Sequence, residues 1–285
     1  MAWNPLDAVP GWALATFAYL IAALAAGRWG LRTQDPGQHW TEHLGDLRKR
    51  VMVAGGSLLA VALLLFSVRM EGGIPRPALH DSLASQAFTL MVDDLLPEGV
   101  QLVVVRPIDG FLAQMTLAMG IAALVTAPVW VTQLAGFVTP ALRPHERRAV
   151  RDAVAPVIAL FALGAAFAYL YVIPFLLKTL YGYGTALDAQ PLLQVSEFIG
   201  FTVGLMAIMG LAFQTPVVMY ALTKAGLVEP IVWRKGWRIA AMAILLVSAL
   251  VTDPTVVSQL MVAAPLMFLY VVGVVACQTI RPASR

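Results

Sequence analysis

The stretch of residues 154–177 reads VAPVIALFALGAAFAYLYVIPFLL, and it decides the class of fold. It contains no Lys, Arg, Asp or Glu, and its length is close to the roughly 20 residues with which an α-helix crosses a bilayer. It also lacks the alternation of apolar and polar residues that is typical of an outer-membrane β-strand. Because every backbone polar group needs an internal partner in lipid, this stretch predicts a transmembrane helix.

Further apolar runs on both sides of this stretch repeat the pattern. They are residues 51–68, 111–136, 198–222, 239–251 and 256–280. Overall, 60% of the residues are hydrophobic and 12% are charged, with a mean hydropathy of +0.79. Soluble domains have about 45–50% apolar and about 25% charged residues. The sequence therefore predicts an all-α, polytopic integral membrane helical bundle.

One run is unusually short. Residues 239–251 would span about 20 Å as a helix, well below the roughly 30 Å of the hydrocarbon core. We expect local membrane thinning or partner helices to accommodate it.

An additional apolar run, residues 11–27, precedes all of these. No Lys or Arg comes before it, whereas Arg28 and Arg32 follow it, so it lacks the cationic leader of a signal peptide. We expect a retained span with the N-terminus outside; because the run is short, an interfacial helix is the alternative. This predicts two parts: 1–38, an extra N-terminal span with its linker, and 39–285, a six-span membrane domain.

Basic residues are concentrated in alternate loops. In the predicted topology, four of the 19 basic residues lie outside: Arg69, Arg76, Arg106 and Lys178. This asymmetry, with Arg281 and Arg285 at the end of the chain, predicts a cytoplasmic C-terminus. The net charge of +3 is thereby explained by membrane topology, and we expect no nucleic-acid partner.

Enzyme chemistry is disfavoured by what the apolar runs lack. All four histidines lie in polar segments, which removes the intramembrane imidazole pair of a haem b protein. The sequence has no H-E-x-x-H, G-x-S-x-G, phosphate-loop or C-x-x-C motif, so we expect no cofactor and no metal site. Gly200 and Gly204 fit the small-xxx-small pattern of close helix packing.

Two polar segments carry the most specific signal. His43-Leu-Gly-Asp-Leu-Arg-Lys-Arg50 precedes the run 51–68, and Phe137-Val-Thr-Pro-Ala-Leu-Arg-Pro-His-Glu-Arg-Arg148 follows the run 111–136. We call them the first and second signature segments. They resemble the cytoplasmic signatures H-L-x-E-L-R-x-R and F-x-x-P-x-L-x-x-H-E-R-R of the TatC family, the C subunit of the twin-arginine protein translocase.

Two further matches extend the resemblance to roughly residues 40–280. Phe213-Gln-Thr-Pro216 resembles the family's F-[EQ]-x-P, and Ser258-Gln259 with the following apolar run resembles its last helix. The departures are Asp46 in place of Glu, Gln214 in place of the Glu common in bacterial members, and Thr255 in place of an acidic residue, with Asp253 nearby. The extra N-terminal span is also not part of the usual six-span pattern.

The resemblance implies a receptor for twin-arginine signal peptides. This receptor would be the core of a proton-motive-force-driven translocase that exports folded proteins across a bacterial or archaeal cytoplasmic membrane. The implied partners are the signal peptides, single-span A- and B-type subunits, membrane lipid and a second copy of the chain. The implied peptide-binding residues are Asp46, Arg48, His145, Glu146 and Arg147. The implied contacts to partner helices are Gln214, Pro216, Thr252 and Gln259.

The chemistry of the two carboxylates agrees with this role. Asp46 and Glu146 each lie in a basic segment on the same predicted side of the membrane. A carboxylate binds an Arg guanidinium through two parallel hydrogen bonds, whereas Lys offers a point charge. In the alternative, Asp46 pairs with Arg50, and Glu146 with Arg143 or Arg147, as ordinary ion pairs at helix ends.

Other functions remain open from the sequence. Gln214 lies deep in an apolar run, and the alternative to a partner contact is a hydrogen bond that only joins two helices. A secondary transporter would require an internal repeat and a midplane ion site, which we do not find in the sequence. A diverged structural subunit of another membrane complex is the second alternative.

Overall fold

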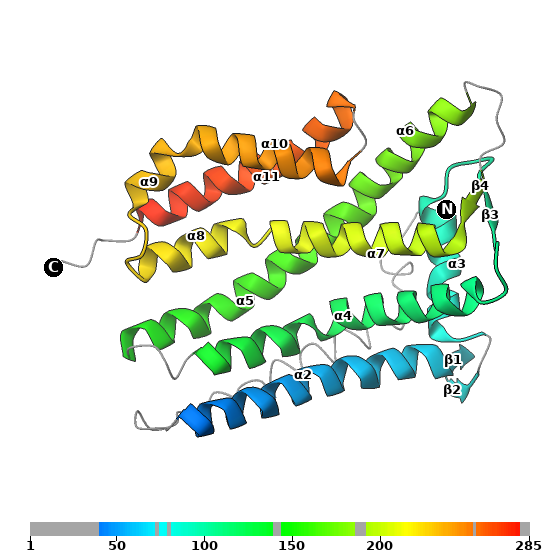
Figure 1. Ribbon diagram of the computed structural model, residues 1–285, viewed down its shortest axis with the longest axis horizontal. Coiled ribbons are helices and arrows are strands. Elements are labelled where there is room, and N and C mark those ends of the chain that lie inside the picture. Colours follow the sequence, from blue (N-terminus) through cyan, green and yellow to red (C-terminus); the bar gives the residue numbers. More distant parts are fainter. Residues whose placement is uncertain are drawn as a thin grey trace, which may run out of the picture. The chain divides into compact units, whose positions relative to one another are not determined.

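The computed structural model describes residues 40–71, 74–78, 81–138, 144–185, 192–252 and 255–279 (Figure 1). The predicted extra span and the domain boundary at residue 38 lie outside these residues. Within them, five helical stretches are long and apolar enough to cross a membrane: Gly45–Ser67, Asp109–Phe137, Ala153–Gly184, Val195–Lys224 and Val256–Gln278. A shorter apolar helix, Trp237–Leu250, covers the predicted short run. The polytopic helical bundle is confirmed.

The described chain folds as two compact units. The first contains the described residues up to Phe88 together with Gln114 to Val138. The second contains Thr89–Ala113 and the described residues from Pro144 onward.

The first unit begins with the long helix α2 (Trp40–Ser67), which continues directly into strand β1 (Val68–Glu71). Strand β1 pairs antiparallel with β2 (Ile74–Pro77), and Val68 lies opposite Pro77. The unit also contains the start of α3 (Leu83–Leu95) and most of α4 (Asp109–Val138). The polar stretch that follows the first described span is therefore built from regular elements.

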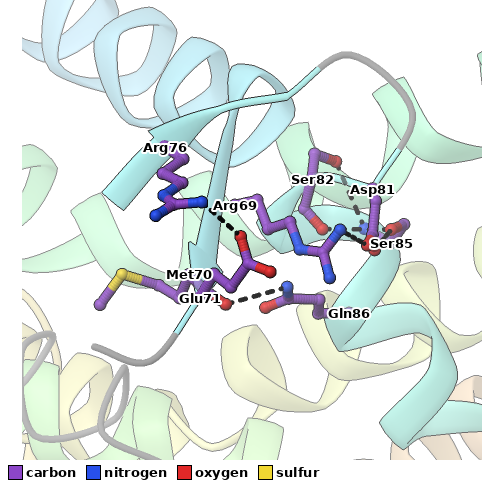
Figure 2. Close-up of polar contacts among 8 residues, drawn as sticks. All are labelled: Arg69, Met70, Glu71, Arg76, Asp81, Ser82, Ser85 and Gln86. Carbon is purple, nitrogen blue, oxygen red and sulfur yellow. Dashed lines mark hydrogen bonds and ion pairs between the residues drawn. The ribbon is translucent and has the colours of Figure 1, made fainter. Parts of the chain in front are cut away.

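Figure 2 shows how side chains join this hairpin to the beginning of α3. Arg69 forms an ion pair with Asp81 at 2.5 Å, and Gln86 Nε2 donates to the Met70 carbonyl at 3.4 Å. The ion pair is half-exposed, so we expect it to contribute little to stability beyond fixing the local geometry.

The second unit contains a buried carboxylate at the first residue of α4. Asp109 is 0% exposed and accepts hydrogen bonds from Arg106 N and Nε, each at 2.9 Å, and from Gln194 Nε2 at 2.8 Å. The side-chain hydrogen bond to Asp109 raises the pKa of the Arg106 guanidinium above its ordinary value. A carboxylate is also favourable at a helix N-terminus. Asp109 thus ties the turn before α4 to Gln194, the residue before α7 (Val195–Ala212).

A short parallel strand pair reinforces the same connection. Strand β3 (Gln101–Val103) pairs with β4 (Leu192–Gln194), and Gln101 lies opposite Leu192. Since β4 runs directly into α7, the strand pair and the Asp109 hydrogen bonds position the start of that helix together.

The predicted span 154–177 lies in one continuous helical stretch. It consists of α5 (Pro144–Phe167), the π-helical segment η2 (Ala168–Val172) and α6 (Ile173–Thr185). In η2 a backbone hydrogen bond spans five residues instead of the four of an α-helix: Ile173 N donates to the Ala168 carbonyl. Pro174 follows immediately and cannot donate a backbone hydrogen bond, which accounts for an irregular turn at this point.

The next span is interrupted at the Phe213-Gln-Thr-Pro216 motif. Helix α7 ends at Ala212, and α8 (Thr215–Lys224) begins three residues later. Pro216 has no N–H for the Ala212 carbonyl, but Thr215 Oγ1 donates to that carbonyl at 2.7 Å. The hydroxyl therefore replaces the hydrogen bond that the proline removes, as lipid requires.

The close crossing of α5 and α7 uses glycines other than the predicted pair. A Cβ at Gly164 would lie 2.6 Å from the Met209 carbonyl oxygen, and one at Gly210 would lie 2.7 Å from the Phe161 ring. Within the described residues, a Cβ at Gly200 or Gly204 would have no neighbour within 4 Å. The small-xxx-small prediction for that pair is wrong, because α7 turns a different face toward α5.

The last helices form a compact group around α11 (Val256–Gln278), with α8 and α10 (Trp237–Val251) packed against it (Figure 1). The short helix α9 (Pro230–Lys235) connects α8 to α10. Trp233 in α9 is held from two sides. Its Nε1 donates to Thr223 Oγ1 at 2.9 Å, and its carbonyl accepts from Tyr270 Oη at 2.5 Å.

Candidate functional site

The first signature segment forms the beginning of α2. Asp46 Oδ2 accepts a hydrogen bond from Arg50 Nε at 2.7 Å, and the two side chains are only 15% and 13% exposed. Arg48, in contrast, is exposed. The pairing follows from the helix, since residues four apart lie on the same face. The alternative that the sequence left open for Asp46, a pairing with Arg50, is therefore present in the structure.

Arg50 also reaches the end of α4. Its guanidinium lies against Gly136, where a Cβ would overlap the Nη1 atom. Gly136 directly precedes Phe137, the first residue of the second signature segment. Arg50 of the first signature segment therefore lies against the residue that precedes the second segment, within the first unit.

Sequence reasoning gave Gly136 no role and treated Arg50 only as an alternative partner for Asp46. The available signal was weak: Gly136 is the last residue of an apolar run, immediately before a specific polar motif. Glycine is common near helix ends because of its backbone conformation alone, so only the contact with Arg50 reveals the function of Gly136.

His145, Glu146 and Arg147 lie in the first turn of α5, which begins at Pro144. Proline is well suited to the first turn of a helix, because the N–H that it lacks would be unpaired there. The side chains of these three residues, and Arg143 as a whole, lie outside the described part of the chain. Their predicted part in peptide binding, and the alternative ion pairs of Glu146, therefore remain predictions.

Gln214 lies at the break between α7 and α8. Its Nε2 donates to the Val157 carbonyl of α5 at 3.1 Å and to the Gly210 carbonyl at 3.3 Å. The Gln214 amide thus links α5 to α7, which is the helix-joining hydrogen bond that the sequence left open as an alternative. Its Oε1 atom is buried and accepts no hydrogen bond from the described residues.

The other predicted partner-contact residues have internal roles. Pro216 is buried against α11, where a Cβ at Gly273 would lie 3.1 Å from its Cα. Its predicted contact with a partner helix stays a prediction. Thr252 Oγ1 donates to the Ser248 carbonyl at 2.8 Å, and Gln259 Nε2 donates to the Leu245 carbonyl at 2.9 Å.

Helix α10 has one strongly exposed apolar face. Its residues Ile239, Met242, Leu246 and Leu250, spaced three or four apart, are between 63% and 79% exposed. On the opposite face, Ala240 and Ile244 pack against the core cluster of Met219, Tyr270 and Cys277. The helix has 15 residues, about 22 Å, and is still shorter than a bilayer core of roughly 30 Å.

Comparison with known proteins agrees with these features. Residues 42–265 match the family model described as Sec-independent protein translocase protein (TatC). The chain belongs to the TatC family. A TatC protein of Cenarchaeum symbiosum is 36% identical over 243 residues, which cover 81% of this chain and 91% of the relative. A TatC protein of Aquifex aeolicus is 32% identical over 241 residues, covering 82% and 92% of the two chains.

A solved structure supports the same assignment. The crystal structure of the twin-arginine translocase receptor TatC superimposes with a TM-score of 0.65 at 29% identity, covering 83% of this chain and 98% of that chain. This TatC family member is accordingly a multi-pass membrane subunit of a protein translocase, and it is not an enzyme. The predicted extra N-terminal span precedes the family match, which begins at residue 42.

Proposed function

We propose that this chain is the twin-arginine signal-peptide receptor and the core of a translocase that uses the proton-motive force to export folded proteins. The observation that carries the proposal is the largely buried pair of Asp46 and Arg50 in the first signature segment. Arg50 bonds Asp46 and lies against Gly136, the residue that precedes the second segment. The receptor role in the name of the solved relative supports it further.

Asp46 and Glu146 would bind the two arginines of the signal peptide. Charge-assisted hydrogen bonds between carboxylate and guanidinium are strong, and partial burial such as that of Asp46 strengthens them by lowering the local dielectric. Arg48, His145 and Arg147 would surround the site with positive charge. A cationic peptide would then bind only where a carboxylate compensates this repulsion, and lysine would fit the planar site less well than arginine.

A single-span A- or B-type subunit would dock along the exposed face of α10 and at the break at Gln214. The Oε1 atom of Gln214 provides a buried acceptor, and a helix too short for the bilayer is better accommodated by protein than by lipid. Thr252 and Gln259 belong to the same α10–α11 hairpin and would shape the end of this surface. A second copy of the chain and membrane lipid would cover the remaining apolar faces.

The proposed orientation places the signature segments in the cytoplasm of a bacterium or archaeon, with the N-terminus outside and the C-terminus inside. It follows from the distribution of basic residues along the chain. An Asn4→Cys variant should react with an impermeant thiol reagent from the outside. Labelling only from the cytoplasmic side would rule out the extra N-terminal span.

The receptor proposal is tested by binding of a twin-arginine peptide and its Lys-Lys variant to the full chain in nanodiscs. We expect a clear preference for the arginine pair, and copurification of twin-arginine precursors from cells. A structural subunit of another complex would show no such preference and would copurify with unrelated, fixed partners.

A further inference from the structure

We propose that Arg50 is an internal competitor of the signal peptide. Its guanidinium pairs with the Asp46 carboxylate in the empty receptor, and the free energy of its displacement lowers the affinity for the arginine pair. This inference rests on the proposed receptor function, and it assigns an affinity-setting role to a residue outside the predicted peptide-binding set.

Arg50 binds the same carboxylate that a peptide arginine would bind. Asp46 Oδ2 already accepts the Arg50 Nε hydrogen bond at 2.7 Å. A peptide arginine would need both carboxylate oxygens to form its two parallel hydrogen bonds. Because Arg50 Nε uses an acceptor site of Oδ2 and its positive charge already neutralises the carboxylate, a peptide guanidinium that binds Asp46 competes with Arg50 for it.

The burial of the pair gives this competition an appreciable strength. The two side chains are 15% and 13% exposed, so both charges are largely removed from water. An exposed i, i+4 pair would contribute very little, but a partly desolvated one is harder to separate without a replacement charge. The incoming guanidinium of the peptide is such a replacement.

Gly136 leaves the space in which the Arg50 guanidinium lies. The guanidinium occupies the place that a Cβ of residue 136 would take, so a larger residue there would make it shift. Substitution of Gly136 is therefore a way to disturb the pair without removing the charge of Arg50.

Competition of this kind weakens the binding of any cation to Asp46 by the same free energy, because every ligand of that carboxylate must displace Arg50. The choice between arginine and lysine is made by the carboxylate itself, since a guanidinium can form two parallel hydrogen bonds and an ammonium offers only a point charge.

The test is peptide binding to the full chain in nanodiscs with three variants. Arg50→Gln should bind the twin-arginine peptide about threefold to tenfold more tightly than wild type. It should bind the Lys-Lys peptide more tightly by about the same factor, because the free energy of displacing Arg50 is common to both peptides. Gly136→Ala should shift both affinities in the same direction by a smaller factor. Lys49→Gln is the matched control, because it removes an exposed positive charge from the adjacent residue and should leave both affinities close to those of wild type.

Thermal unfolding of each variant separates binding effects from loss of structure. Unchanged or weaker twin-arginine binding by a folded Arg50→Gln variant would overturn the inference, since Arg50 would then position Asp46 rather than compete for it. If Arg50→Gln does not fold, Gly136→Ala decides by the same criteria. A wild-type chain without preference for the arginine pair refutes the proposed receptor function itself, and this inference with it.

Discussion

Asp46 and Asp109 are two aspartates whose side chains are largely or wholly buried, yet their surroundings differ. Asp109 is 0% exposed and accepts hydrogen bonds from both Arg106 and Gln194. Asp46 remains 15% exposed and accepts one hydrogen bond within the described part of the chain, from Arg50. A carboxylate offers about four acceptor sites; among the described residues at least three of them are used at Asp109 and one at Asp46.

The same contrast holds for two glutamines. Gln194 donates to Asp109 and helps to complete a closed group, whereas Gln214 donates through its nitrogen and leaves Oε1 buried without a partner among the described residues. Buried polar atoms are normally paired, so we expect Oε1 of Gln214 to find a partner beyond the described residues. A polar side chain whose hydrogen-bonding capacity is filled within the chain should thus be needed for folding, and one with unused capacity should be needed for binding.

The largest expected effect is on folding, at Asp109. Asp109→Asn exchanges a carboxylate oxygen for an amide that cannot accept from Arg106, and it places donors opposite donors in a buried site. We expect the thermal midpoint to fall by about 5 °C or more, with normal peptide affinity in the fraction that remains folded. The exposed Asp93→Asn is the matched control and should change neither value. Equal stability of the two variants would remove the distinction drawn between Asp109 and Asp46.

Glu146 should show the largest effect on binding. Truncating one partner of a partly buried charge pair typically costs about 2–5 kcal/mol, or roughly thirtyfold to several thousandfold in affinity. We therefore expect Glu146→Ala to abolish measurable binding of the twin-arginine peptide to the purified chain, while its thermal midpoint stays near that of wild type. A variant that folds and keeps the wild-type preference for the arginine pair would show that Glu146 is a surface ion-pair residue.

Asp46→Ala should weaken binding less than Glu146→Ala, because part of the Asp46 carboxylate is already committed to Arg50. Asp46→Glu should be tolerated, since it restores the residue usual in the family. The measurement is the ratio of twin-arginine to Lys-Lys peptide affinity. An ordinary surface salt bridge is worth only about 0–1 kcal/mol and would leave this ratio unchanged.

The smallest effect is expected at Gln214. Gln214→Leu removes the open acceptor and the two donated hydrogen bonds, and we expect several-fold weaker crosslinking of a single-span partner along α10, with signal-peptide binding intact. Gln278→Leu, at the exposed end of α11, is the control for the same change of side chain. If both variants crosslink as wild type does, the partner surface lies elsewhere.

The sequence by itself determined the class of fold, the described spans and the family. Apolar runs such as residues 154–177 predict helices because the bilayer leaves the backbone no other way to pair its polar groups. The signature segments were recognisable because they are contiguous, and Pro216 indicated an irregularity because proline lacks a donor wherever it stands.

Tertiary structure alone decided how polar and small residues are used. The contact of Arg50 with Gly136, the hydrogen bond from Gln194 to Asp109 and the crossing at Gly164 each join residues from segments well separated in the sequence. The pattern at Gly200 and Gly204 was as good as any for close packing, yet α7 presents a different face to its neighbour. Local sequence specifies which residues share a helix face, but the partner opposite that face is set by how distant helices pack.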